Sequence, residues 1–242
     1  MGTTAKTYVE EPVSETVGAV VARDYRAAAI LEKYGIDFCC GGNVPLAKAC
    51  QDNGIDQEAL RRELEQAAAH PVDRSQNYDA WELPFLADYI VNTHHIYLRE
   101  NIPTISAYAH KIAQVHGAHH PEVIEIAGIF DKLAADMALH LQKEEEQLFP
   151  AIRKLALLEK EGNAAAGDVA ELMKILAELS HEHDEVGAAI HEIRRLAGNY
   201  TVPADACNTF MVTYRKLREF EDDLHKHVHL ENNILFLKAA RL

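Results

Sequence analysis

From about residue 79 the chain repeats apolar side chains in alternating steps of three and four residues. This spacing places them along one face of an α-helix. One segment, for example, carries the stripe Ile126, Phe130, Leu133 and Met137. Four such amphipathic segments, separated by turn-rich breaks, run to the C-terminus. The pattern predicts an all-α fold, an up-and-down four-helix bundle.

The first seventy or so residues show a different pattern of short helical segments. Gly35 and Gly54 follow two of them, as helix-ending glycines commonly do. The polar, turn-rich stretch HPVDRSQNYD at residues 70–79 then separates this part from the long helices. We therefore expect two domains, a small N-terminal helical domain over residues 1–77 and the bundle over residues 78–242.

Polar residues interrupt the apolar stripes of the bundle at regular places. Two segments carry a histidine followed four residues later by a glutamate: His140-x-x-x-Glu144 and His227-x-x-x-Glu231. Residues four apart lie on the same face of a helix, so each pair offers an imidazole and a carboxylate to one metal or to neighbouring metals.

The stripes also select one histidine on each of the other two helices. On the first helix they favour His94 over His95, and on the third they favour His183 over His181 and His191. Taken alone, each such histidine is more often an ordinary core residue than a ligand. The prediction depends on their coincidence with the two His-x-x-x-Glu pairs.

The distances along the chain predict that these residues share one layer. In an up-and-down bundle, residues at equal height on consecutive helices are equidistant from the connecting loop. The midpoints between the selected histidines fall at Gly117, near Gly162 and at Asp205, in or beside turn-rich segments. Four histidines and two glutamates are therefore expected at one height in the core.

Such a layer needs a compensating partner. Each buried charge without one costs roughly several kcal/mol. Histidine nitrogen with carboxylate oxygen suits iron, manganese or zinc, and carboxylates from two helices can bridge two ions. Six protein ligands leave coordination positions open for chemistry or for a small ligand. The alternative is a polar layer held by hydrogen bonds alone.

The stretch IDFCCGGN in the N-terminal part contains adjacent cysteines, Cys39 and Cys40, followed by two glycines. Adjacent cysteines form only a strained disulfide, and the glycines leave the backbone open around the sulfurs. Two interpretations stay open, a buried small pair in a tight turn or a redox-active or iron-contacting thiol pair.

Other candidate sites are weaker. The Glu178-x-x-His181 element cannot place both residues on the stripe of the third helix. His116, His119 and His120 suggest a loop metal site, but a solvated loop is the better interpretation. We also expect Glu145 and Glu146, which follow Glu144, to face water.

Composition narrows the function classes. The net charge of −14 argues against nucleic acids and anionic membrane surfaces as partners. No apolar run reaches the roughly 18 residues of a membrane span, and the N-terminus lacks the apolar segment of a signal peptide. Four cysteines are too few and too oddly spaced for a disulfide framework. A cytoplasmic location is expected.

The motifs together resemble a known family. YGIDFCCGG, HLQKEEEQLFP, HEHDEVG and HVHLENNILF are similar to signatures of the repair-of-iron-centres family, the YtfE/ScdA/DnrN-type proteins, over nearly the whole chain. The resemblance implies a hemerythrin-like bundle with two non-haem iron ions, bridged by oxo or hydroxo groups and by the two glutamates. It implies iron ligands at His94, His140, Glu144, His183, His227 and Glu231.

The implied function is repair of iron-sulfur clusters damaged by nitrosative or oxidative stress, by supplying iron. Damaged iron-sulfur proteins, nitric oxide or oxygen species would be the partners, and the resemblance also points to a homodimer and to a thiol role for Cys39 and Cys40. The alternatives are nitric oxide or oxygen binding or sensing, and nitric oxide or nitrite reduction at the same site. Oxygen-carrying hemerythrins use a fifth histidine and a final aspartate, where this chain has Gly187 and Glu231.

Overall fold

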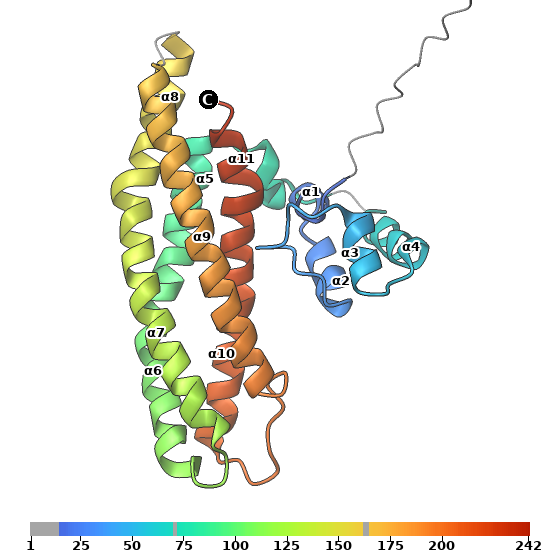
Figure 1. Ribbon diagram of the computed structural model, residues 1–242, viewed down its shortest axis with the longest axis vertical. Helices are drawn as coiled ribbons and strands as arrows, with labels where there is room; N and C mark the ends of the chain where they lie inside the picture. The colour runs from blue at the N-terminus through green and yellow to red at the C-terminus, as the bar shows by residue number, and fades with distance from the viewer. Residues whose placement is uncertain (1–14, 70–71, 162–164) are drawn as a thin grey trace, which may run out of the picture.

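The C-terminal part of the chain forms an up-and-down four-helix bundle in this computed structural model, which describes residues 15–69, 72–161 and 165–242 (Figure 1). Three of its four helices are continuous through a π-helical turn, and the third, α9, is regular. In chain order the bundle comprises α5 (Leu83–Ile90), η3 (Val91–His95) and α6 (Ile96–His116); α7 (Glu122–Lys143), η4 (Glu144–Leu148) and α8 (Phe149–Glu161); α9 (Ala166–Leu196); and α10 (Asn208–Leu230), η5 (Glu231–Leu235) and α11 (Phe236–Ala239). The predicted all-α fold is confirmed.

Two of the three predicted midpoints fall in connections between helices of the bundle. Gly117 ends α6 and opens the turn to α7, and Asp205 lies in the connection between α9 and α10. Gly162, the third predicted midpoint, lies outside the described residues. Residues at equal height on neighbouring helices can therefore meet in the core.

The apolar core of the bundle consists of two clusters, one on each side of the expected polar layer. One cluster includes Leu98, Phe130 and Ile190, and the other includes Leu86 and Ile152; all are buried. Since apolar burial above and below excludes water from the layer, any charge in it has to be compensated locally.

Residues 15–69 of the N-terminal part form four short helices: α1 (Val17–Arg23), α2 (Ala27–Lys33), α3 (Leu46–Asp52) and α4 (Gln57–Ala67). Gly35 and Gly54 follow α2 and α3 with positive φ angles of 70° and 64°, which glycine adopts without strain. Two 3₁₀ turns, η1 (Arg74–Gln76) and η2 (Tyr78–Ala80), lead from this part to α5.

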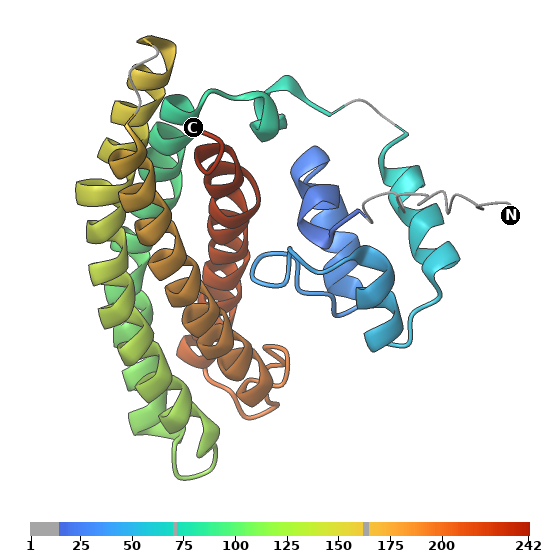
Figure 2. The same cartoon turned by 45° about the horizontal axis from the view of Figure 1, so that its top comes forward.

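The N-terminal helices lie beside α10, and the loop between α2 and α3 reaches toward the bundle (Figure 2). We call residues 37–43 of this segment the Cys-Cys loop. Asn233 of η5 donates a hydrogen bond to the carbonyl of Phe38 at 3.0 Å, and Glu32 of α2 lies 3.2 Å from the imidazole of His225 on α10. The described part of the chain has no helix that combines the length and apolarity of a membrane span.

Candidate metal centre

Local irregularities in three helices bring the polar layer together. A π-helical turn adds a residue to the helical repeat, and such turns are frequent at functional sites. His95 ends η3, while Glu144 and Glu231 each begin a π-helical turn, η4 and η5. His183 comes from the regular helix α9.

One group of potential ligands consists of His95, Glu144, His227 and Glu231, all buried. Their ligand atoms lie within 4.8 Å of one another. The Nε2 atom of His95 is 3.3 Å from Oε2 of Glu144, and the Nε2 atom of His227 is 3.0 Å from Oε1 of Glu231. This is a compact set of two nitrogens and two oxygens.

The second group consists of His140, Glu144, His183 and Glu231, also buried and within the same 4.8 Å limit. His140 Nε2 lies 3.4 Å from Oε1 of Glu144, and His183 Nε2 lies 3.2 Å from Oε2 of Glu231. Each glutamate therefore directs one oxygen toward the first group and the other oxygen toward the second. This is the arrangement that carboxylates need to bridge two ions.

The structure brings five of the six predicted ligands together but places His95 where the sequence pattern favoured His94. His94 lies outside both groups; its Nδ1 atom is 3.0 Å from Asp223, and its ring stacks on that of His227. The sequence prediction continues the apolar stripe of the first helix with a regular helical repeat. The π-helical turn at Val91–His95 shifts the register by one residue.

The donor set fits a bound cation. Both carboxylate oxygens of Glu144 and Glu231, and the Nε2 atoms of His95 and His227, are buried without a hydrogen-bond partner in the described part of the chain. Burial raises the pKa of Glu231, but His227 and His183 outweigh it and hold this pKa well below its usual value. Carboxylates that stay charged while buried among imidazole nitrogens fit a bound cation.

The outer nitrogens of three ligand imidazoles are held by side chains around the site. Glu145 lies 2.7 Å from His95 Nδ1, Glu182 lies 2.8 Å from His140 Nδ1, and Asn232 Oδ1 lies 2.8 Å from His183 Nδ1. Such contacts fix the tautomer that leaves Nε2 free to bind a metal. The prediction that Glu145 faces only water is wrong, because the π-helical turns bring it to His95. No sequence pattern distinguished Glu182 or Asn232.

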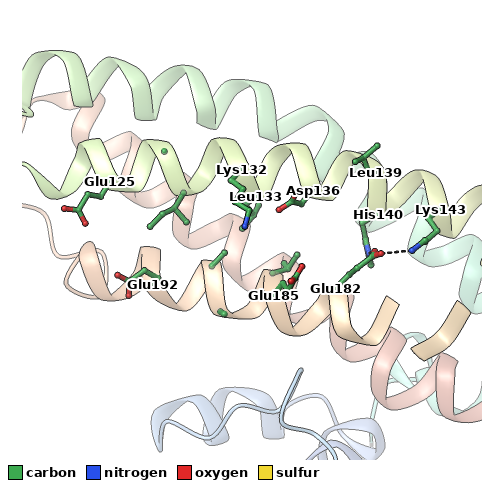
Figure 3. Close-up of a pocket in the computed structure, with 15 residues that line it drawn as sticks. Glu125, Lys132, Leu133, Asp136, Leu139, His140, Lys143, Glu182, Glu185 and Glu192 are labelled. Atoms are coloured by element: carbon green, nitrogen blue, oxygen red, sulfur yellow. Dashed lines mark hydrogen bonds and ion pairs between the residues drawn. The ribbon is translucent and has the colours of Figure 1, made fainter. Parts of the chain in front are cut away.

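An open groove runs between α7 and α9 and ends beside the second group (Figure 3). Its volume is about 1090 Å³, and Ile129, Leu133 and Val186 contribute to its apolar lining. Lys143 and Glu182 form an ion pair of 2.7 Å at the end where His140 lies. The hydrogen bond from His140, followed by the Lys143 contact, lowers the pKa of Glu182 to about 2, so this carboxylate stays charged at neutral pH.

The two cysteines of the Cys-Cys loop are free thiols, Cys39 buried and Cys40 partly exposed, with sulfurs 3.8 Å apart. Together with Asp37 they form a third group of potential metal ligands. The Cys40 contact, burial and Asp37 raise the pKa of Cys39 well above its usual value, so the thiol is protonated at neutral pH. The Cys40 thiol lies 3.4 Å from the carbonyl oxygen of His183.

The weaker candidates have other contacts. His116 lies 3.1 Å from the thiol of Cys207, and His120 lies between Glu122 and Asp205. Among the described residues, none of the potential metal groups includes a histidine of this loop.

Comparisons with known proteins agree with this arrangement. Residues 86–239 match the family described as the hemerythrin HHE cation binding domain, and residues 13–68 match ScdA_N, described as a domain of unknown function. The fold and the site therefore define a hemerythrin-like cation-binding bundle with an appended N-terminal domain.

Curated relatives cover nearly the whole chain. The iron-sulfur cluster repair protein ScdA of Staphylococcus haemolyticus is 33% identical over 94% of this chain and 99% of its own length. The iron-sulfur cluster repair protein YtfE of Musicola paradisiaca is 33% identical over 94% of this chain and 96% of its own length, and that of an Escherichia coli strain is 31% identical over 96% and 97%. The chain belongs to the ScdA/YtfE family.

Proposed function

We propose that this protein binds two iron ions in the two ligand groups and supplies iron for the repair of iron-sulfur clusters damaged by nitrosative or oxidative stress. The observation that carries the two-ion proposal is the orientation of Glu144 and Glu231, each with one oxygen toward each group. The relatives named as iron-sulfur cluster repair proteins support iron and repair.

The ligands would be His95 and His227 in one group and His140 and His183 in the other, with both glutamates shared. Bound iron would supply an exchangeable cation with coordination positions open to small ligands such as nitric oxide or oxygen species. The protein side chains do the positioning. Glu145, Glu182 and Asn232 orient the imidazoles, and the apolar clusters exclude water.

The charge of the ligand set favours an iron donor. Two carboxylates neutralise only half of the charge of two divalent ions, and the imidazoles add none. Ligand charge tunes the affinity of metal sites, so a set with few anionic ligands holds its ions less tightly.

Gly187 favours repair over reversible oxygen storage. It lies four residues after His183 on α9, where oxygen-carrying hemerythrins place a fifth histidine. A side chain there would displace Cys40, because a Cβ atom on Gly187 would lie 2.8 Å from the thiol sulfur of Cys40.

We further propose damaged iron-sulfur proteins as the clients and the cytoplasm as the location. The division into domains at residues 1–77 and 78–242 and a homodimeric state are also proposals. The thiol role of Cys39 and Cys40 remains a prediction that is consistent with their position beside His183.

The function is tested with an iron-sulfur enzyme whose cluster has been degraded by nitric oxide. We expect the iron-loaded protein to restore its activity faster than the same amount of free ferrous iron under a reductant. The Glu144→Gln/Glu231→Gln variant should do no better than free iron. Equal recovery with the wild type, the variant and free iron would contradict the proposal.

A further inference from the structure

The side chain of Asn232 joins the Cys-Cys loop to the metal centre. Its Oδ1 atom accepts a hydrogen bond from Nδ1 of His183 at 2.8 Å, and its Nδ2 atom donates one to the carbonyl oxygen of Cys39 at 3.2 Å. An amide can do both, whereas an ionised carboxylate only accepts. The partners of the other ligands, Glu145 and Glu182, are carboxylates.

The same loop lies against the turn of α9 that carries His183. The Cys40 thiol donates to the His183 carbonyl at 3.4 Å, and its sulfur occupies the space left by Gly187, one turn further along. A Cβ atom on Gly187 would lie 2.8 Å from this sulfur, and rotation of the Cys40 side chain away from it would break the contact with the His183 carbonyl. Two independent contacts therefore link the loop to His183.

We propose that Asn232 is a positioning residue that couples docking of the Cys-Cys loop to metal retention by the His140–His183 group. The docked loop fixes the Asn232 amide through the Cys39 carbonyl, and the fixed amide holds His183 in the tautomer that binds metal through Nε2. The inference rests on the metal-binding part of the proposed function and not on cluster repair.

The coupling is reciprocal. If a docked loop strengthens metal binding at His183, then bound metal must favour the docked loop by the same factor. Opening of the loop would loosen the ion held by His140 and His183 and leave the contacts of His95 and His227 unchanged. The N-terminal domain would then control the release of one of the two ions.

Asn233 is a matched control on the neighbouring position. Its Nδ2 atom donates to the carbonyls of Phe38 and Cys39 at 3.0 Å and 3.4 Å, so it holds the same loop. It contacts His229 but none of the ligands proposed here. Removing Asn233 should weaken docking while the link through Asn232 remains.

The test compares the full-length wild type with Asn232→Ala, Asn232→Asp and Asn233→Ala, each metal-free and loaded with ferrous iron under anaerobic conditions. Hydrogen exchange of residues 37–43 reports loop docking, and the rate of iron transfer to a chelator reports retention. In the wild type we expect iron to slow exchange of the loop several-fold.

In Asn232→Ala the effect of iron on loop exchange should disappear, and iron release from one of the two positions should become about 10-fold to 100-fold faster. Asn232→Asp keeps the acceptor for His183, so its iron release should stay close to wild type. It lacks the donor to the Cys39 carbonyl, so the effect of iron on hydrogen exchange of the loop should be lost. Asn233→Ala should increase the hydrogen-exchange rate of the loop both with and without iron. The ratio of these two rates should stay as in the wild type. Wild-type coupling in Asn232→Ala, or the same loss of coupling in Asn233→Ala, would overturn the inference.

A second variant tests the contact at Gly187. Gly187→Ala should increase loop exchange and iron release, and Gly187→Ala/Cys40→Ala should return both to the level of Cys40→Ala alone, because the clashing sulfur is gone. Gly128→Ala on α7, where an added Cβ meets nothing within 4 Å, is the control. Absence of the effect or of its reversal would contradict the packing part of the inference. A wild type that binds no iron would instead contradict the proposed function.

Discussion

The two ligand groups share both glutamates but differ in what surrounds them. His95 is held by Glu145, a partly exposed residue of η4 that also contacts Arg99, and His227 Nδ1 has no hydrogen-bond partner in the described part of the chain. His140 and His183 are held by Glu182, beside the open groove, and by Asn232, beneath the Cys-Cys loop. The nearly symmetric ligand set therefore has unsymmetric surroundings, which provide a route to unequal release of the two ions.

The largest effect is expected when the shared residues are changed. Glu144→Gln/Glu231→Gln should bind almost no iron, because both groups lose their only anionic ligands. The metal-free variant should unfold at a higher temperature than the metal-free wild type, since two buried, uncompensated charges are removed. Metal analysis and thermal unfolding measure these changes, with Glu146→Gln at an exposed position as the control.

The independence of the two groups is tested by single histidine changes. His183→Ala and His227→Ala should each lower the iron content from about two per chain to about one, because each belongs to one group only. Wild-type iron content in either variant would remove that residue from the ligand set.

The first helix presents two neighbouring histidines, His94 and His95, of which we expect only His95 to bind iron. His95→Ala should lose iron from the first group, whereas His94→Ala should retain about two iron ions, because His94 belongs to neither group of potential ligands. Metal content of the two variants decides between the neighbours. The reverse result would identify His94 as the ligand, as the sequence pattern predicts.

The smallest effects are expected from the carboxylates that hold the imidazoles. Glu145→Gln and Glu182→Gln should each weaken iron binding by about 10-fold to 100-fold, the first at the His95–His227 group and the second at the His140–His183 group. Competition with a chelator, followed as two phases of release, separates the groups. A change in the same phase for both variants would show that the groups are not separable.

Helical periodicity and loop spacing were sufficient to predict the bundle and most of the ligand layer. His140, Glu144, His227 and Glu231 follow from their i, i+4 spacing, and His183 follows from its stripe on a regular helix. His95 did not, because a regular repeat carried through a π-helical turn selects its neighbour His94.

The role of Asn232 depends on contacts between parts of the chain that are distant in sequence. Nothing in ENNILF distinguishes Asn232 from Asn233, and only docking of the Cys-Cys loop gives them different partners. Gly187 could be recognised as a missing histidine, but the reason for its small size lies in Cys40, which comes from the other domain. Such contacts are set by tertiary packing and have no local pattern.

We propose that two iron ions lie side by side in the shared ligand layer. X-ray absorption of the anaerobically loaded wild type, combined with metal analysis, tests it most directly. We predict about two irons per chain and an iron-iron distance of about 3.5–4 Å, the separation usual in two-metal sites. A single metal per chain, or two irons without an iron-iron contribution, would contradict it.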